Sequence, residues 1–125
     1  RERGVAMDDM CEVTQYGHTD LDMAEIEAML ATDPNNEYLL DIAAFAYYSD
    51  GRLQEALAAY TRLVALSFGK ACHHLYLGNV LYKLERSEDA YREWKLAEKL
   101  DEKGKYGKKA RERLSLVNAL ASRAV

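Results

Sequence analysis

The chain has 125 residues, of which 49% are apolar and 30% charged, and it has the length and composition of a single core-forming domain. No window approaches the ~20 consecutive apolar residues of a membrane-spanning helix, so we expect no membrane contact by this segment. The formal net charge of −4 conceals an asymmetry: residues 7–60 hold twelve acids and one base, whereas residues 61–125 hold fourteen bases and eight acids.

Apolar residues recur at helical spacing along the chain, which predicts an all-α structure. The expected helices span 5–16, 20–32, 37–49, 52–66, 71–84, 87–101 and 105–122. Thr19, Asn36 and Ser87 are the expected N-caps, because short polar side chains accept hydrogen bonds from the free N–H groups of a helix start. Gly51 predicts a left-handed turn residue between two helices. Glu85 stands at the corresponding place in the next pair, where a left-handed backbone would cost about 1 kcal/mol.

The sequence repeats itself at a fixed period. Residues 37–70 align with residues 71–104 without a gap, and the same register makes residues 3–36 a third, degenerate copy. In that copy Asp9 and Asp22 occupy positions where the better copies carry apolar or small residues. The chain is therefore expected to be built from repeated helix hairpins.

Small and aromatic residues alternate at fixed positions of the repeat. Small residues allow two helices to approach closely, and an aromatic fills the space toward a neighbouring hairpin. We expect Gly78 and Ala90 to be buried where helices cross, and Trp94 and Tyr60 to be buried as well. The matching positions of the two copies are Leu77, Gly78, Leu81, Ala90, Trp94 and Ala97, and Ala43, Ala44, Tyr47, Ala56, Tyr60 and Leu63.

This pattern resembles the tetratricopeptide repeat (TPR) family over almost the whole chain. The resemblance implies a single domain, 1–125, folded as an α-solenoid of three hairpins with a C-terminal capping helix at 105–122. The capping helix carries one apolar stripe that is expected to pack on the preceding hairpin. The stripe consists of Ala110, Leu114, Val117 and Ala121.

The resemblance also implies a function, that of a non-catalytic module binding a partner protein or peptide in a concave groove. First helices line the groove in this family, and an empty groove with a merely structural wall remains the alternative. Only Asn79 matches the residues with which some relatives clamp a chaperone tail, so that function is not transferred. The expected lining residues are Met7, Cys11, Thr14, Gln15, Tyr38, Asp41, Phe45, Tyr48, Ser49, Cys72, Leu75, Asn79, Tyr82, Lys83, Lys109 and Arg113.

The charge asymmetry suggests what the partners are. Lys83, Lys109 and Arg113 would attract an acidic peptide, whereas the acidic and basic halves together suggest the second hypothesis, an assembly protein that self-associates end to end. A basic run within 103–113 invites a nucleic-acid interpretation. The pI near 5.4 and the single aromatic Tyr106 in that run argue against it, so no nucleic-acid partner is expected.

Catalytic and metal-binding patterns do not emerge from the sequence, and we expect no enzyme activity and no cofactor. Adjacent His73 and His74 would point about 100° apart on a helix, which makes a shared metal site unfavourable. Cys11 and Cys72 lie far apart in the sequence and are expected to be free thiols in a reducing compartment, the cytoplasm, with an intermolecular disulfide as the alternative. Because the sequence begins at Arg1, an upstream leader, anchor or further repeat is left open.

Overall fold

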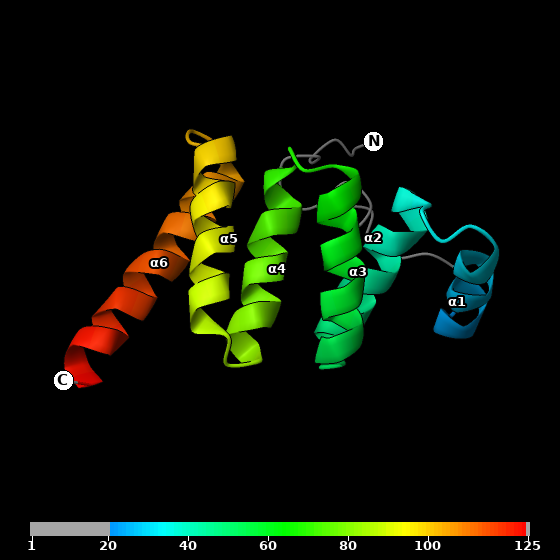
Figure 1. Ribbon diagram of the computed structural model, residues 1–125, viewed down its shortest axis with the longest axis horizontal. Coiled ribbons are helices and arrows are strands. Elements are labelled where there is room, and N and C mark those ends of the chain that lie inside the picture. Colours follow the sequence, from blue (N-terminus) through cyan, green and yellow to red (C-terminus); the bar gives the residue numbers. More distant parts are fainter. Residues whose placement is uncertain (1–20, 125) are drawn as a thin grey trace. The chain divides into compact units, whose positions relative to one another are not determined.

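The computed structural model describes residues 21–124, which form six α-helices and no strand within that range (Figure 1). The all-α prediction is confirmed. The chain divides into two compact units, Arg1–Phe68 and Gly69–Val125. The helices are α1 (Met23–Thr32), α2 (Glu37–Ser49) and α3 (Leu53–Leu66) in the first unit, and α4 (Ala71–Lys83), α5 (Ser87–Leu100) and α6 (Lys105–Ala124) in the second.

Six of the seven expected helices agree closely with the structure, and the largest difference is at α1, which begins at Met23 rather than at residue 20. The remaining expected helix, over 5–16, lies outside the described residues, as do Asp9 and the expected N-cap Thr19. The start of α1 is instead a capping box, in which the Asp22 side chain accepts from the Glu25 N–H at 2.9 Å and the Glu25 side chain accepts from the Asp22 N–H at 2.9 Å. The acid that looked like a repeat defect is thus a helix cap.

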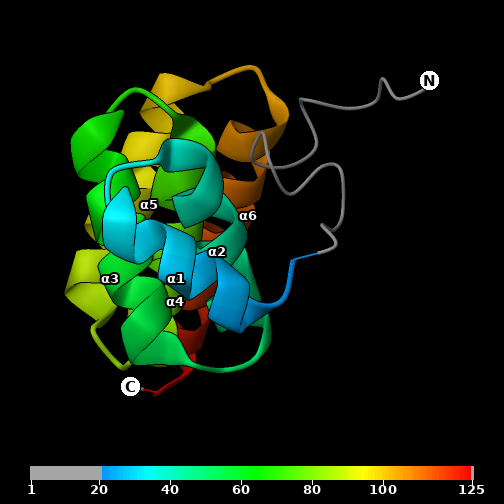
Figure 2. The ribbon, with the colours of Figure 1, turned by 90° about the vertical axis from the view of Figure 1, so that its right-hand side faces the viewer.

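In the first unit, α1 packs against α2, and α2 and α3 form an antiparallel hairpin (Figure 2). Asn36 caps α2 as expected, because its side chain accepts from the Leu39 N–H at 3.0 Å. Gly51 has φ 77°, which confirms the left-handed turn between the two helices. The buried apolar residues of this unit are Ile26, Leu39, Leu40, Ala43, Ala44, Ala56, Ala59, Tyr60 and Leu63.

In the second unit, α4 and α5 form a hairpin whose helices begin and end at the repeat positions equivalent to those of α2 and α3. Glu85 adopts φ 64° at the turn, so this residue is left-handed although it is not glycine. Gly78, Ala90 and Trp94 are buried as expected. A Cβ on Gly78 would lie 2.5 Å from Nε1 of Trp94, which is too close for two atoms that are not bonded. The Trp94 ring on α5 can therefore pack against α4 here only because residue 78 has no side chain.

The start of α5 differs from the prediction. Ser87 is the first helical residue, and the N-cap is Arg86, which makes no side-chain hydrogen bond to the helix backbone. Arg86 instead pairs with the acid one turn ahead, with its Nη2 2.8 Å from Oδ2 of Asp89. This ion pair places a negative charge at the helix N-terminus, where the helix dipole favours one.

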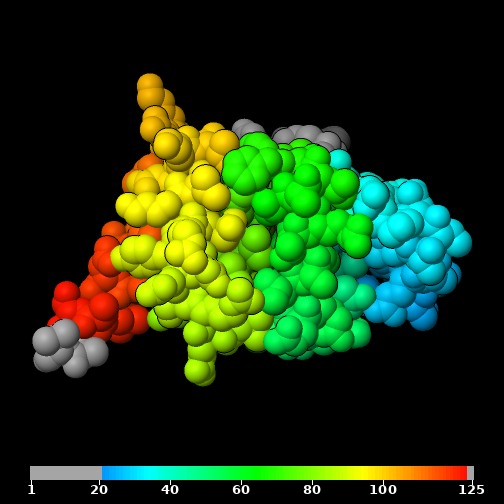
Figure 3. Space-filling view, in the orientation of Figure 1, coloured from blue at the N-terminus to red at the C-terminus, as the bar shows by residue number. Residues whose placement is uncertain are grey.

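Helix α6 packs against α5 through Ala110 and Leu114, which are buried. Its start is fixed by Asp101, whose side chain accepts from the Tyr106 N–H at 3.0 Å. The expected apolar stripe is only half used, because Val117 is half-buried and Ala121 is exposed. The reason is geometric: α6 diverges from α5 toward its C-terminal end, and its last turns (red) extend clear of the hairpin in Figures 1 and 3.

Candidate functional site

Five residues of the expected groove lie on α2, in the first unit. Tyr38 is the most accessible aromatic among them, with 59% of its surface exposed, and Ser49 is exposed at the end of the helix. Phe45 and Tyr48 are half-buried neighbours whose ring centroids lie 6.5 Å apart at an interplanar angle of 44°. Asp41 is only 3% exposed. Of this set, Tyr38 is therefore the side chain best placed to meet a partner.

The other expected groove residues lie on α4 and α6, in the second unit. Tyr82 and Lys83 are exposed at the end of α4, and Lys109 and Arg113 are exposed on α6. The remaining members, Cys72, Leu75 and Asn79, are buried. Met7, Cys11, Thr14 and Gln15 lie outside the described residues.

Asn79 is occupied by a contact inside its own unit. Its Oδ1 accepts a hydrogen bond from Nε1 of Trp94 at 3.1 Å, and the side chain is buried. Trp94 also packs against Tyr82, with ring centroids 5.6 Å apart. This arrangement satisfies the indole N–H in the core, as a buried tryptophan requires.

Cys72 corrects the expectation of a free thiol. It is disulfide-bonded, and it is the only cysteine among the described residues. Separation along the sequence and the absence of a short cysteine motif do not exclude a disulfide. Disulfides persist mainly in oxidising environments. The thiol on which the expected reducing compartment rested is therefore not present at Cys72.

Three side chains join α1 to the hairpin that follows it. The hydroxyl of Tyr47 donates a hydrogen bond to Oε2 of Glu27 at 2.5 Å. The guanidinium of Arg52 lies over the Tyr47 ring, 4.7 Å from its centroid, and its Nη2 is 3.8 Å from the same Glu27 oxygen. Burial, followed by this hydrogen bond to a carboxylate, raises the pKa of Tyr47 to about 12. We call this cluster the Tyr47 clamp.

An arginine–acid pair opens the second helix of each hairpin. Nη2 of Arg52 is 3.2 Å from Oε2 of Glu55, and Arg86 and Asp89 repeat this pair at the equivalent positions of the next copy. The hydrogen bonds from Arg86 and Arg92 hold the pKa of Asp89 below its usual value. The pair is visible in the repeat alignment as an arginine followed one helical turn later by an acid, and this signal was missed.

The two adjacent histidines lie in the core of the second unit. His73 and His74 are both buried, and Nδ1 of His74 lies 2.7 Å from Oε1 of Glu93 on α5. This contact ties α4 to α5. Among residues 21–124, no group of three or more His, Cys, Asp or Glu side chains is arranged to hold a metal ion.

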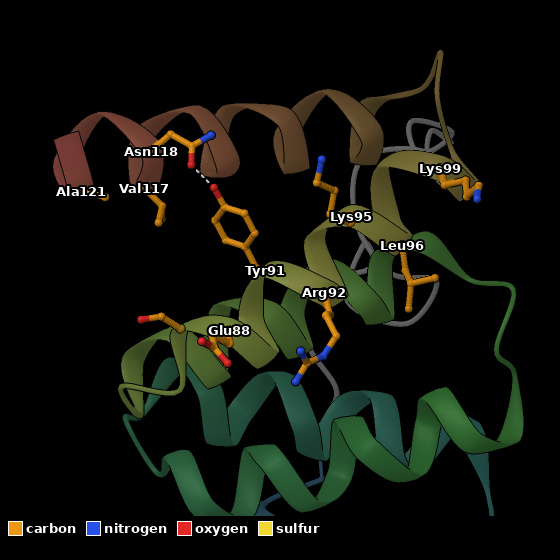
Figure 4. A pocket seen from close by; sticks show the side chains of 10 residues that line it. Glu88, Tyr91, Arg92, Lys95, Leu96, Lys99, Val117, Asn118 and Ala121 are labelled. Carbon is orange, nitrogen blue, oxygen red and sulfur yellow. Dashed lines mark hydrogen bonds between the residues drawn. The ribbon is translucent and has the colours of Figure 1, made fainter.

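A cavity of about 770 Å³ lies between α5 and the diverging end of α6 (Figure 4). Its volume falls in the range of small-ligand sites. Sequence reasoning missed it, because it treated Val117 and Ala121 as packed residues and could not foresee the divergence of α6. The lining residues are Ser87, Glu88, Tyr91, Arg92, Lys95, Leu96, Lys99, Val117, Asn118 and Ala121.

One hydrogen bond crosses the cavity. Tyr91 points from α5 toward α6, and its hydroxyl donates to Oδ1 of Asn118 (Figure 4). Three basic side chains, Arg92, Lys95 and Lys99, stand on α5 beside it, against one acid among the lining residues, Glu88. The cavity is therefore an apolar recess with a predominantly basic border.

Within the described range, no helix combines the length and hydropathy needed to cross a membrane. Comparison with protein-family models and with curated proteins gave no match for this chain. The features of this chain that bear on function are its repeated hairpins, the exposed side chains of α2 and α4, and the cavity between α5 and α6.

Proposed function

We propose that this chain is a TPR-like α-solenoid domain that binds a partner protein or peptide and catalyses no reaction. The observation that carries the proposal is the recurrence of helix starts at one constant offset: α2 and α4 begin at 37 and 71, and α3 and α5 begin at 53 and 87. The left-handed turn residues at 51 and 85 recur with the same period. Repeats of this kind expose long surfaces built from equivalent helices, which suit the binding of extended partners.

Each of the two units offers an accessible part of the expected groove for this binding. Tyr38 and Tyr82 supply exposed aromatic area on α2 and α4, which are equivalent helices of the repeat. Rigid aromatics are enriched in interfaces because they bury a large surface at a small entropic cost. Lys83, Lys109 and Arg113 are exposed bases, and they favour a partner with acidic residues.

The proposal is tested by affinity capture from the native host, followed by titration of each captured protein. Parent protein and a Tyr38→Ala variant would be immobilised side by side. We expect the variant to bind the captured partner about tenfold more weakly, because the loss of a hot-spot aromatic costs more than about 1 kcal/mol. Phe68→Ala is the matched control, because Phe68 is 57% exposed, close to the 59% of Tyr38, but lies outside the expected groove.

Thermal unfolding of the same variants separates binding from folding. Both positions are exposed, so both variants should melt close to the parent. Equal binding by parent, Tyr38→Ala and Phe68→Ala would contradict the proposed surface.

A second candidate function, end-to-end self-association, is favoured by the charge distribution. Residues 21–60 hold eight acids and the single base Arg52, whereas exposed bases concentrate at 103–113. Complementary ends would give rings or filaments, and salt near ~1 M should dissociate them because exposed charges are strongly screened there. Sedimentation of the parent at low and high salt, beside a Lys108→Glu, Lys109→Glu, Arg113→Glu variant, tests this. A parent that stays monomeric at low salt and high concentration rules the candidate out.

A further inference from the structure

The cavity between α5 and α6 runs along more than three turns of α5. Its α5 wall is a ridge that winds along the helix, in which Ser87, Tyr91, Lys95 and Lys99 recur at every fourth position. From the first to the last of these the ridge extends about 18 Å, at ~1.5 Å per residue. A helix of about three turns would match this length. The opposite wall is the last part of α6, which diverges and leaves the groove open (Figure 4).

Apolar surface lies inside the groove and beside it on α6. Leu96 and Val117 are half-buried lining residues, and Ala121 is exposed within the lining. On the same part of α6, Leu116 is 55% exposed and Leu120 is 45% exposed. Large exposed leucines close to an open apolar recess are unusual on a surface that faces only water.

The border of the groove carries the charge that selects a partner. Arg92, Lys95 and Lys99 are exposed on the α5 side, and Arg92 has an acidic neighbour, Asp89, within ion-pair distance. The lining as a whole has three bases against the one acid Glu88. A basic partner would meet repulsion here, whereas an acidic one gains attraction along most of the groove.

We propose that this groove binds an amphipathic helix of a partner protein, with its apolar side in the recess and an acidic flank against Lys95 and Lys99. The inference deepens the proposed binding function and rests on it. A helix fits better than an extended peptide, because both walls are helices that offer side chains rather than a free strand edge. A helix pairs its own N–H and C=O groups internally, so it can lay an apolar side on this recess without backbone partners.

A second copy of this chain is a poorer occupant than a partner. The acidic helix it could offer from the described residues, α1, already has its apolar Ile26 buried against its own unit. Glu27 of the same helix is engaged by Tyr47 and Arg52. Docking α1 into another copy would break these contacts, so the acidic flank is expected to come from another protein.

The test uses a synthetic probe and the full chain. The probe is an alanine-based helical peptide of about 14 residues, with leucines every three or four positions and glutamates on one flank. We expect it to bind with a Kd below about 100 µM, and the same peptide with lysines for glutamates to bind at least about tenfold more weakly.

Two variants locate the binding. The double variant Lys95→Glu, Lys99→Glu should bind the acidic peptide about tenfold or more weakly than the parent does. It should bind the lysine peptide more tightly. Lys103→Glu with Lys108→Glu is the matched control, because it changes the net charge equally at exposed positions outside the groove, and its effect should stay below about threefold. Ala121→Trp fills the recess from an exposed position and should also abolish binding, with an unchanged melting temperature.

Each alternative result overturns the inference in a distinct way. Equal binding of both peptides would refute the requirement for an acidic flank. Full binding of the acidic peptide by the Ala121→Trp variant would refute the groove as the binding site. Sedimentation that shows oligomers of the parent but not of Ala121→Trp would make a second copy the occupant. A captured partner that depends on Tyr38 but binds the Lys95→Glu, Lys99→Glu variant normally would leave the proposed function standing and refute only the groove.

Discussion

The hairpins α2–α3 and α4–α5 have equivalent helix boundaries but different interiors. At the close approach of its two helices, the second hairpin combines Gly78 with Trp94. The equivalent residues of the first hairpin are Ala44 and Tyr60, which are also fully buried. A larger aromatic is thus accompanied by a smaller residue at the other position. The repeat keeps the backbone path, while the volumes of individual side chains are exchanged within each hairpin.

The turns of the two hairpins also differ, but here the glycine belongs to the first hairpin and the larger residue to the second. Gly51 adopts φ 77° at little cost, whereas Glu85 adopts φ 64° with a side chain. The flanking ion pairs are nevertheless equivalent, because Arg52–Glu55 and Arg86–Asp89 follow the two turns. The second hairpin therefore leaves no room for a Cβ at position 78 and has the more strained turn. This contrast can be tested by exchanging residues between the two hairpins.

The largest expected effect is that of Trp94→Ala. Trp94 is 1% exposed, and its removal leaves a cavity and an unpaired Asn79 amide, so we expect a loss of about 4 kcal/mol of unfolding free energy. Trp94→Tyr, which copies the first hairpin, should lose less than half as much. Urea unfolding monitored by circular dichroism measures both. Similar losses for the two variants would show that the indole hydrogen bond, rather than the filled volume, dominates this core.

Gly78→Ala is expected to destabilise the protein, although alanine is the better helix former. The added Cβ would stand 2.5 Å from Nε1 and 2.6 Å from Cδ1 of a rigid buried ring. The overpacking should outweigh the gain in helix propensity, with a net loss of about 1–3 kcal/mol in the same urea experiment.

A double-mutant cycle sharpens this prediction. Gly78→Ala combined with Trp94→Tyr reproduces the pair found at Ala44 and Tyr60, so the two losses should be clearly less than additive. Strictly additive losses would mean that the small residue and the aromatic are not coupled energetically. The exchange of side-chain volume between the two hairpins would then not contribute to stability.

The parts of the structure that the sequence predicted are those that depend on local or repeated signals. Helix boundaries followed from apolar spacing and turns, and Asn36 and Gly51 behave as their residue types require. The failures are nonlocal. The disulfide at Cys72 depends on which chain segments meet, and the half-used stripe with Ala121 depends on how far α6 diverges from α5. The burial of Asn79 was not predicted, because the periodicity of one helix does not show that a tryptophan on the next helix will donate a hydrogen bond to this side chain.

The turn comparison predicts a smaller, stabilising change. Glu85→Gly removes the cost of a left-handed side-chain-bearing residue and should raise the unfolding free energy by about 1 kcal/mol. The mirror substitution Gly51→Ala should lower it by about the same amount, since nothing lies within 4 Å of the added Cβ and only the backbone is affected. Differential scanning calorimetry would show melting temperatures that move in opposite directions. A fall in melting temperature for Glu85→Gly would indicate that the Glu85 side chain makes a compensating contact.

The smallest expected effect concerns Tyr47, whose equivalent in the second hairpin is the buried Leu81. Only in the first hairpin does a phenol at this position attach a preceding helix, α1, and Tyr47→Phe removes the hydrogen bond to Glu27 while keeping the ring under Arg52. The hydrogen bond is exposed, so the loss at neutral pH should be about 1 kcal/mol or less.

The pH dependence of this loss tests the clamp specifically. The pKa of Tyr47 is raised from 10.0 to about 12 in the folded protein, first by burial and then by the hydrogen bond to Glu27. A raised pKa means that the folded state keeps the phenol protonated above the pH at which the unfolded chain loses this proton. The stability contributed by the hydroxyl is therefore fully present below about pH 10 and is lost as the pH rises through about 12. The difference in unfolding free energy between the parent and Tyr47→Phe should shrink across this interval, while Tyr38→Phe, on the same helix but 59% exposed, serves as the control. A difference that stays constant from about pH 9 to about pH 12 would mean that Tyr47 titrates like an ordinary tyrosine, and that its hydroxyl does not help to hold α1 to α2.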